Sequence, residues 1–109
     1  MSTISTHVLD VVLGKPATRV AVRLEKLVEN AWVKRCESAT DEEGRCRELT
    51  HGELPGTYRL TFRTDAYFAR SGRTSIYPEI SITFICGRED HYHLPLLLSE
   101  NGYTTYRGS

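Results

Sequence analysis

Hydrophobic and polar side chains alternate along most of this sequence, and this pattern constrains the fold more than any other feature. The clearest case is residues 56–63, where Tyr58, Leu60 and Phe62 fall on one face and polar or charged residues on the other. A period of two residues is typical of a β-strand with one buried face. Five further segments are expected to form strands: 3–10, 20–32, 79–86, 91–98 and 103–106. The chain is therefore predicted to be an all-β protein, an antiparallel β-sandwich of seven or eight strands.

The alternation also assigns side chains to faces. In residues 3–10, Ser5 and His7 share a face with Leu9. In residues 91–98, His91 and His93 share a face with Pro95 and Leu97. In residues 79–86 the side chains expected to point inward are Ile80, Ile82, Phe84 and Cys86.

Two segments carry helical features. Residues 65–72 are predicted to form the one short helix, with Asp65 as the N-cap and Gly72 just past the end. Residues 20–32 are ambiguous, because their apolar residues fit both helical and strand spacing. We expect a strand there, since β-branched residues such as Val20 open the segment.

Glycine and proline mark the turns. Turns are expected at residues 14–17 and 41–44, the second with Gly44 in a left-handed conformation. Asn101–Gly102 is expected to supply the positive-φ residues of a tight hairpin. Pro95 lacks an N–H group, so it is predicted to lie at a sheet edge or a bulge.

Length and charge limit what such a sandwich can bind. The 109 residues fit a single domain, 1–109, whose small core leaves little room for a deep private pocket. If the chain is an enzyme, its pocket is therefore expected to form between subunits. The 14 Lys and Arg residues balance 14 Asp and Glu residues without any basic run, which argues against a nucleic-acid partner.

Nothing in the sequence predicts a membrane partner. The longest apolar run, 94–98, is interrupted by Pro95 and is far shorter than the roughly 18 residues of a membrane span. Residues 1–7 lack the basic and apolar regions of a signal peptide. The three cysteines form no C-x-x-C pair, which favours free thiols and a cytoplasmic location.

Four histidines are the first candidates for chemistry. His91 and His93 are two residues apart on a predicted strand, so their rings point the same way. Such a pair can serve as a metal-binding arm with His7 as a third ligand, although Asp90 would point to the opposite face. General acid–base catalysis is a second interpretation, and ordinary hydrogen-bonded histidines are a third. The local sequence leaves all three open.

Arginine and the end of the sequence supply weaker signals. The chain has 11 Arg but only 3 Lys, and Arg suits bidentate recognition of carbonyl and anionic groups. Arg45 directly follows the turn glycine Gly44, which fixes its direction. Residues 106–109 follow the last predicted strand without a polar tail, which indicates either a functional terminus or simple pairing at a sheet edge.

Five motifs occur along the chain in a fixed order: residues 7–17 (HVLDVVLGKPA), Gly44–Arg45 after an acidic turn, 76–80 (IYPEI), 91–99 (HYHLPLLLS) and 106–109 (YRGS). Together they resemble the transthyretin-related family over essentially the whole chain. The terminal tetrapeptide is the most specific, since it marks the enzyme branch, the 5-hydroxyisourate hydrolases, and is absent from hormone-carrying transthyretins. Glu100 departs from the pattern, because the family usually has proline there.

The resemblance implies an eight-stranded transthyretin-like sandwich assembled as a homotetramer, a dimer of dimers. It places the active sites at the dimer–dimer interface. The implied reaction is hydrolysis of the cyclic amide of 5-hydroxyisourate, a product of urate oxidation. The product is 2-oxo-4-hydroxy-4-carboxy-5-ureidoimidazoline, in purine catabolism. No metal or other cofactor is implied.

The resemblance also assigns site residues: His7, Arg45 and His93 as catalytic, and His7, Arg45, Tyr106 and Ser109 as substrate-binding. His51 and His91 carry no role in this assignment. We expect His7 and His93 to share the activation of water and the protonation of the leaving nitrogen, and Arg45 to stabilise the oxyanion. Tyr106 and the residues after it are expected to close the pocket.

Two rival functions come from other classes. One is a transthyretin-like module that binds a small aromatic ligand without catalysis. The other is an extracellular adhesion-type sandwich, which the free cysteines and the absence of a signal peptide disfavour. His7 with His93 and the terminal tetrapeptide 106–109 favour the hydrolase. Without the resemblance, the residues leave all three functions open.

Overall fold

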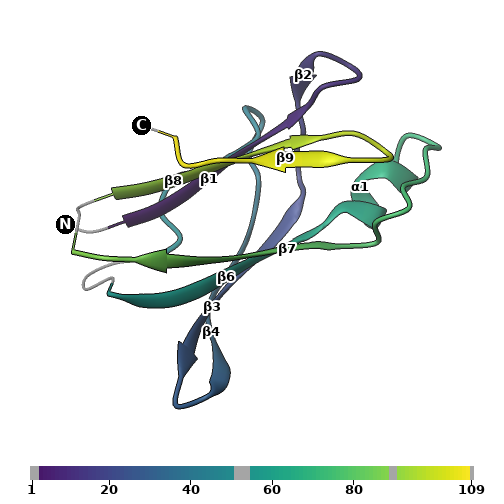
Figure 1. Ribbon diagram of the computed structural model, residues 1–109. Coiled ribbons are helices and arrows are strands. Elements are labelled where there is room, and N and C mark those ends of the chain that lie inside the picture. The colour runs from purple at the N-terminus through teal and green to yellow at the C-terminus, as the bar shows by residue number, and fades with distance from the viewer. Residues whose placement is uncertain (1–2, 51–54, 89–90, 109) are drawn as a thin grey trace.

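The computed structural model describes residues 3–50, 55–88 and 91–108, which form two facing β-sheets and one short helix (Figure 1). The elements in chain order are β1 (Thr3–Asp10), β2 (Lys15–Pro16), β3 (Ala21–Val28), β4 (Ala31–Ala39), β5 (Arg45–Cys46), β6 (Gly56–Arg63), α1 (Thr64–Ala69), β7 (Ile80–Cys86), β8 (His91–Leu98) and β9 (Tyr103–Thr105). The predicted all-β sandwich with one short helix is confirmed. In these ranges no helix is long and apolar enough to span a membrane.

One pair of strands departs from the antiparallel arrangement. The first sheet has the order β2–β1–β8–β9 with β5 also paired to β1, and the second has the order β4–β3–β6–β7. Strands β1 and β8 run parallel over their whole length, from Thr3–His91 to Asp10–Leu98, whereas the other strand pairs are antiparallel. Alternation predicts which face a side chain occupies but not the direction of its neighbour. This parallel pair places segments from opposite ends of the chain side by side.

The core between the sheets follows the predicted faces. Tyr58, Leu60 and Phe62 of β6 are all buried, at 2%, 0% and 0% exposure. The side chains of β7 predicted to point inward do so, but they are not equally buried. Ile80 and Cys86 are buried, while Ile82 and Phe84 are half-buried and pack against the core. The reason is that β7 is the edge strand of its sheet, so its middle is only partly covered.

The single strand expected over residues 20–32 is wrong in extent. Strand β3 ends at Val28, and β4 returns antiparallel from Ala31. Glu29 and Asn30 form the connection, with positive φ angles of 50° and 68°. Two consecutive left-handed residues make the tight turn that suits a two-residue hairpin. The turn escaped prediction because apolar residues continue on both sides of it.

Helix α1 is confirmed in place but begins differently from the prediction. Its N-cap is Arg63, which makes no side-chain capping bond, and Asp65 lies in the first turn instead. An acidic residue there still interacts favourably with the helix dipole. The buried Thr64 anchors the helix start by donating its hydroxyl to the carbonyl oxygen of Tyr77 at 2.8 Å. Gly72, with φ of 70°, lies past the helix end as expected.

The β8–β9 connection is not the tight turn that was expected. Both the backbone N–H and the hydroxyl of Ser99 donate to the carbonyl oxygen of Gly102, at 3.0 and 3.1 Å. Neither Asn101 nor Gly102 has a positive φ angle. The loop therefore spans four residues, and the Asn-Gly dipeptide does not serve as a two-residue turn.

Pro95 lies inside a sheet rather than on an edge strand, since β8 runs between β1 and β9. The ladder toward β9 is interrupted beside it, between the Leu96–Thr105 pair and a separate bridge from His93 to Gly108. The carbonyl oxygen of Pro95 accepts the hydroxyl of Thr105 at 2.8 Å instead of a backbone N–H. The missing N–H is thus tolerated because the ladder is irregular at this point.

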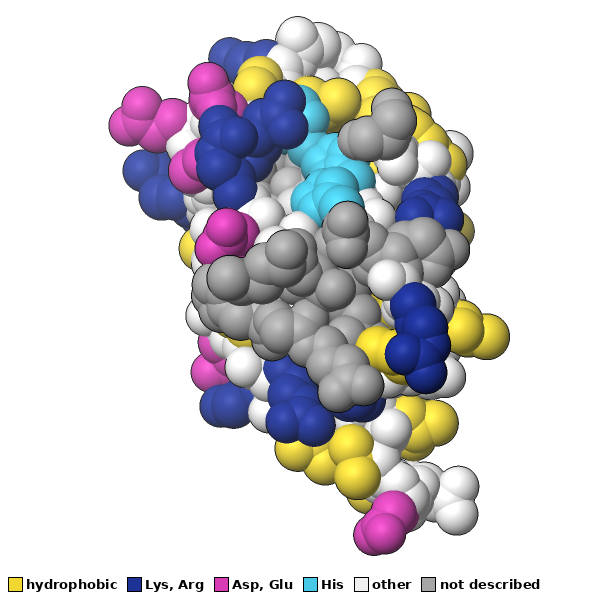
Figure 2. All heavy atoms as spheres, turned by 90° about the vertical axis from the view of Figure 1, so that its left-hand side faces the viewer, with side chains coloured by type: hydrophobic (Ala, Val, Ile, Leu, Met, Phe, Trp, Pro, Cys, Tyr) yellow, Lys and Arg dark blue, Asp and Glu magenta, His cyan; other side chains and the backbone are white. Residues whose placement is uncertain are grey.

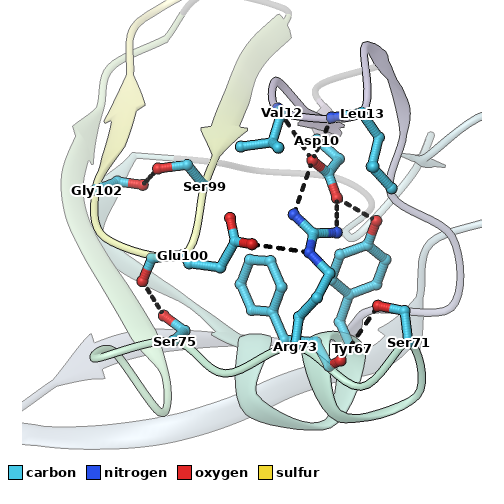
Figure 3. A network of polar contacts seen from close by, with 11 residues as sticks. Asp10, Val12, Leu13, Tyr67, Ser71, Arg73, Ser75, Ser99, Glu100 and Gly102 are labelled. Atoms are coloured by element: carbon cyan, nitrogen blue, oxygen red, sulfur yellow. Dashed lines mark hydrogen bonds and ion pairs between the residues drawn. The ribbon is translucent and has the colours of Figure 1, made fainter.

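A buried ion pair ties the end of β1 to the segment after α1 and to the β8–β9 loop (Figure 3). The Asp10 side chain is 0% exposed and accepts hydrogen bonds from Arg73 Nη1 and from the Tyr67 hydroxyl, each at 2.7 Å. Arg73 Nε in turn donates to Glu100 Oε2 at 2.9 Å. We refer to Asp10, Tyr67, Arg73 and Glu100 as the Asp10 cluster.

The charges of the Asp10 cluster are fixed by its own contacts. Burial alone raises the pKa of Asp10, but hydrogen bonds from Arg73, Tyr67 and backbone N–H groups outweigh it and lower that pKa below its usual value. Burial and the bond to Asp10 raise the pKa of Tyr67 to about 12. The bond from Arg73 lowers the pKa of Glu100. Around neutral pH every member therefore keeps one protonation state.

Candidate active site

The parallel register of β1 and β8 brings polar side chains from both ends of the chain onto one outer face. Directly paired residues of neighbouring strands point to the same side of a sheet. Three pairs on this face carry the residues of interest: Thr3–His91, Ser5–His93 and His7–Pro95. Figure 2 shows histidine side chains gathered on one face of the molecule, beside a group of Lys and Arg side chains. We refer to Thr3, Ser5, His91 and His93 as the histidine cluster.

Arg45 reaches the same face through β5, which pairs with β1 so that Arg45 lies opposite His7. The turn before it is fixed by Asp41, whose Oδ1 accepts the backbone N–H groups of Glu43 and Arg45 at 2.8 and 2.9 Å. These bonds, the one from Arg45 first, lower the pKa of Asp41 below its usual value. The acidic turn therefore positions the arginine that follows it.

Gly44 explains why the turn lies so close to β1. Its φ angle is 79°, and a Cβ atom at this position would lie 2.4 Å from the carbonyl oxygen of Val8. The Gly44 carbonyl oxygen also accepts the Val8 N–H at 2.7 Å. A side chain would push the turn away from β1, and Arg45 would move with it.

Two shallow hollows meet at Arg45. One, of about 210 Å³, is lined by Ser5, Arg45, Arg47, His91 and His93 among others. The other, of about 590 Å³ and more open, is lined by His7, Pro16, Glu43, Arg45 and Arg47. Arg45 and Arg47 line both, so the hollow beside His93 adjoins the hollow beside His7 at these two arginines.

His93 is half-buried and held at both its backbone and its ring. Its carbonyl oxygen accepts the Gly108 N–H at 2.7 Å, and its Nδ1 lies 2.7 Å from the Ser5 hydroxyl oxygen. Burial lowers the pKa of His93, and the nearby charges of His91, Arg45 and His7 lower it further. The imidazole is therefore neutral at physiological pH, and the side chain lines the smaller hollow.

His7 has a defined tautomer. Its Nε2 lies 2.8 Å from the carbonyl oxygen of Glu43. A carbonyl oxygen only accepts, so Nε2 must carry the hydrogen. In the neutral ring Nδ1 then carries no proton. It is the nitrogen that can exchange a proton with a ligand.

The two arginines differ in how they are held. Arg47 Nη2 donates to Glu43 Oε1 at 2.7 Å, whereas Arg45 Nε lies 4.0 Å from the same oxygen. Arg45 is also the residue that pairs directly with His7. The better candidate for binding a carbonyl oxygen or an anion between the two histidines is therefore Arg45.

The end of the chain runs back along β8. Besides the Gly108 bond, Arg107 Nη2 donates to the carbonyl oxygen of His91 at 3.2 Å, and its guanidinium lies 4.2 Å from the centroid of the Tyr92 ring. A Cβ atom at Gly108 would lie 2.7 Å from Cδ2 of His93. Only glycine lets the backbone approach the imidazole this closely.

Four of the seven site residues discussed from the sequence come together on this face: His7, Arg45, His91 and His93. Tyr106 lies in the tail and is 52% exposed. Ser109 and His51 lie outside the described residues. Sequence reasoning missed Ser5, Arg47 and Gly108 as parts of the site. The signal for Ser5 was present, since the alternation already placed it on the face of His7.

The His-x-His pair does not present itself as a metal-binding arm. The rings of His91 and His93 are nearly parallel, 12° apart, with centroids separated by 6.2 Å. His91 Nε2 and His93 Nδ1 both lie within hydrogen-bonding distance of the Ser5 hydroxyl, at 3.2 and 2.7 Å. Within the described part of the chain, no three His, Cys, Asp or Glu side chains are placed to hold a metal ion.

Comparisons with known proteins identify the family of this chain. A profile of the HIUase/Transthyretin family matches residues 4–108. The chain is 43% identical over 109 residues to the 5-hydroxyisourate hydrolase of Salmonella typhimurium, covering 97% of this chain and 80% of that protein. It also superposes on the structure of Klebsiella pneumoniae 5-hydroxyisourate hydrolase with a TM-score of 0.89 and 44% identity, covering both chains completely.

A second solved structure shows that the backbone alone does not distinguish a hydrolase from a transthyretin. Sea bream transthyretin in complex with thyroxine superposes with a TM-score of 0.92, covering 97% of this chain and 94% of that one, at 31% identity. The backbone therefore fits both proteins equally well, and the higher identity lies with the hydrolases. With a family profile that spans nearly the whole chain and relatives well above 30% identity, this chain belongs to the HIUase/Transthyretin family.

Proposed function

We propose that this chain hydrolyses the cyclic amide of 5-hydroxyisourate to 2-oxo-4-hydroxy-4-carboxy-5-ureidoimidazoline, with His7, Arg45 and His93 as its catalytic residues. The relatives named 5-hydroxyisourate hydrolase make the chain a hydrolase and suggest the substrate. The observation that carries the proposal is that His7, Arg45 and His93, from three separate segments, meet on one face.

His93 is suited to be the general base. Its Nδ1 is occupied by Ser5, and its lowered pKa keeps the ring neutral, so Nε2 can accept a proton from a water molecule. The resulting hydroxide adds to the ring carbonyl of the substrate. The ring C–N bond then breaks, a carboxylate forms, and the leaving nitrogen takes up a proton.

His7 and Arg45 complete the step from the other hollow. In its imidazolium form His7 can donate from Nδ1 to the leaving nitrogen, because Nε2 is committed to Glu43. The guanidinium of Arg45 lies between the hollows, where it can donate to the carbonyl oxygen as negative charge develops.

The openness of the site supports an assembly. Ligand pockets usually bury most of a small molecule, whereas the hollow of about 210 Å³ opens to the surface. A second copy that covers this face would close it, so we propose a homotetramer, a dimer of dimers, with sites at the dimer–dimer interface. Tyr106 and Ser109 are proposed to contact substrate there. A single domain over 1–109 and a cytoplasmic location complete the proposal.

The alternative is a transthyretin-like module that binds a small ligand without catalysis. The superposition on sea bream transthyretin favours it as much as the hydrolase. The hydrolase is favoured by a neutral histidine aimed into a hollow beside an arginine, which ligand carriage does not require.

Ultraviolet kinetics on freshly generated 5-hydroxyisourate test the proposal. We expect the wild-type protein to exceed the spontaneous decay, and His7→Ala, Arg45→Ala and His93→Ala each to lose roughly 10²-fold or more in kcat/KM. Arg35→Ala, an exposed arginine on β4, is the matched control and should keep full activity. A wild type no faster than spontaneous decay would contradict the hydrolase and leave the binding module.

The tail is tested separately. A chain that ends at Thr105 should keep its fold by circular dichroism but lose most of its turnover. If it keeps turnover, Tyr106 and Ser109 have no part in the site. Measuring solution mass alongside activity then shows whether dilution to smaller assemblies abolishes turnover before it unfolds the chain, as the proposed interface site requires.

A further inference from the structure

A line of hydrogen-bonding groups leads away from His93, and these groups have no role in the reaction steps described above. The Ser5 hydroxyl oxygen lies 2.7 Å from His93 Nδ1 and 3.2 Å from His91 Nε2. On the far side of His91, its Nδ1 contacts the Thr3 hydroxyl. The line runs from half-buried His93 through the 5% exposed Ser5 to His91, which is exposed to solvent.

The number of hydrogens in this line restricts its states. A serine hydroxyl carries one hydrogen, so it donates to one imidazole nitrogen and accepts a hydrogen from the other. If Ser5 donates to His93 Nδ1, neutral His93 must carry its hydrogen on Nε2. If Ser5 donates to His91 Nε2, then His93 Nδ1 carries the hydrogen and donates it to Ser5. The tautomers of the two histidines are therefore linked.

Only the second state leaves His93 Nε2 able to accept a proton. It requires His91 to have a bare Nε2 and to carry its hydrogen on Nδ1, where the Thr3 hydroxyl can accept it. His91 thus determines, through Ser5, whether His93 can act as a base. His93 itself touches only Ser5 among these partners.

We propose that Ser5 and His91 are positioning residues that hold His93 in its base-competent tautomer and then take over the positive charge formed at it. This inference rests on the proposed function. After Nε2 gains a proton from water, the hydrogen on His93 Nδ1 passes to the Ser5 oxygen and the Ser5 hydrogen passes to His91 Nε2. The proton gained from water stays on Nε2, His93 is neutral again, and His91 is the imidazolium.

The surroundings favour this transfer. His93 is half-buried among cationic groups, where a second positive charge is unfavourable, whereas exposed His91 can be hydrated. The charged and titratable groups around the pair come from three other elements: His7 on β1, Arg45 with Arg47 and Glu43 around β5, and Arg107 in the tail. His93 then keeps Nε2–H as a neutral hydrogen-bond donor, and the proton for the leaving nitrogen comes from His7.

The tautomer can be measured without substrate. In protein labelled with ¹⁵N at its four histidines, the ring nitrogen shifts identify which nitrogen of each neutral ring carries hydrogen. Signals are assigned by removing one histidine at a time. We expect wild-type His93 to carry its hydrogen on Nδ1, and Ser5→Ala to shift it toward Nε2. A wild-type His93 protonated on Nε2 above its pKa would overturn the proposal, as would no change in Ser5→Ala.

Kinetics separate positioning from packing. We expect Ser5→Ala to lower kcat about tenfold with KM changed less than about twofold. The reason is that His93 is no longer held in its base-competent tautomer, while the substrate contacts remain. Ser5→Thr, which keeps the hydroxyl, should restore most of kcat. Ser81→Ala, a serine on the outer face of β7, is the matched control and should change neither parameter. If Ser5→Thr were as slow as Ser5→Ala, the hydroxyl would not be the active group.

The direction of a pH shift tests the link to His91. When His91 is protonated, both its nitrogens donate, so Ser5 must donate to His93 Nδ1 and His93 is no longer a base. The acidic limb of kcat/KM then reports protonation of either ring. His91→Phe should move that limb to lower pH. A neighbour that acts only through its charge would instead move the limb upward on removal, or leave it unchanged.

Failure of this inference can be told apart from failure of the proposed function. If wild-type protein does not hydrolyse 5-hydroxyisourate, the kinetic arms fall with the function, but the tautomer measurement stands. If wild type is active while Ser5→Ala and His91→Phe match it in kcat and pH profile, the hydrolase remains and the positioning role is refuted.

Discussion

Strand β1 carries two polar clusters of opposite character. The histidine cluster lies along its outer face and consists of hydroxyl and imidazole groups joined by hydrogen bonds. The Asp10 cluster lies at its end and consists of groups with fixed charges, around a carboxylate that is 0% exposed. Both contain three or more hydrogen-bonding side chains from distant segments.

The difference lies in how many states each cluster allows. In the Asp10 cluster every pKa shift stabilises the protonation state present at neutral pH. The pKa values of Asp10 and Glu100 are lowered, and those of Tyr67 and Arg73 are raised. In the histidine cluster the single serine hydrogen can be donated to either of two imidazole nitrogens, so two hydrogen-bond arrangements exist. A structural cluster needs one state, whereas a proton-transferring site needs two. Four variants test this contrast.

The largest effect is expected at His93. His93→Gln should lower kcat/KM by about 10²- to 10⁴-fold, the usual contribution of a general base. Because the ring is only half-buried and forms no ion pair with the described residues, the free energy of unfolding should change by less than about 1 kcal/mol. Kinetics and urea denaturation of the same preparation measure both. A large loss of stability would mean that the histidine cluster also supports the fold.

Asp10→Ala should show the reverse pattern. It leaves Arg73 without its buried partner, which typically costs about 3–5 kcal/mol of unfolding free energy. The activity of the protein that remains folded should fall less than about threefold. Asp65→Ala is the matched control, since its ion pair with Arg63 is exposed and worth less than about 1 kcal/mol. Equal losses in the two variants would contradict the structural role of the Asp10 cluster.

Gly108→Ala is expected to affect activity moderately. The added Cβ would lie 2.7 Å from His93 Cδ2, so the tail or the ring must shift by a few tenths of an ångström or more. We expect roughly a tenfold loss of kcat, in line with the sensitivity of catalysis to small displacements. Gly102→Ala is the control, since its added Cβ would meet no atom closer than Ser99 Oγ at 3.9 Å, and its activity should be normal. Unchanged kcat in Gly108→Ala would show that the tail is not packed against His93 in solution.

Tyr67→Phe should have the smallest effect, about 1 kcal/mol at neutral pH for one lost hydrogen bond. Its signature is alkaline. The pKa of Tyr67 rises from 10.0 to about 12 on folding, so the unfolded chain loses this proton first. Wild-type stability should therefore be complete below pH 10 and fall as the pH rises toward 12. Unfolding titrations should show this decline reduced in Tyr67→Phe; identical curves would contradict the buried bond to Asp10.

Acid tests the same cluster from the other side. The pKa of Asp10 is lower in the folded chain than in the unfolded chain, so its contribution is present above about pH 4 and is lost as the pH falls through the folded value. The histidine cluster responds at a higher pH, because protonation of His93 removes activity before Asp10 is protonated. Activity should thus fall at a higher pH than stability.

Local patterns were enough to predict the faces of the site. Alternation placed Ser5 with His7 and His91 with His93, because a strand's period is fixed by its own backbone. The assignment of Arg45 needed the resemblance, although Gly44 hinted at a constrained turn. What alternation could not supply was the parallel register that joins these faces, since strand pairing depends on long-range packing.

The errors have local physical causes. The Glu29–Asn30 turn was missed because apolar side chains flank it on both sides, and neither residue is glycine. The Asn101–Gly102 turn was overestimated because the hydroxyl of Ser99 offers the loop a different closure. Glu100, the departure from the family pattern, has a clear place in the structure, since it pairs with Arg73.

The parallel pairing of β1 with β8 also affects how the site can form during synthesis. His93 and its partner Ser5 are separated by 88 positions. Nearly the whole chain must therefore be made before either has its neighbour, and such distant contacts form slowly. Until then the edge of β1 that pairs with β8 is exposed, although β2 and β5 can already pair with its other edge. An exposed strand edge is prone to association with another chain. The most informative folding intermediates to trap are those in which the second sheet has formed but β1 has not yet paired with β8.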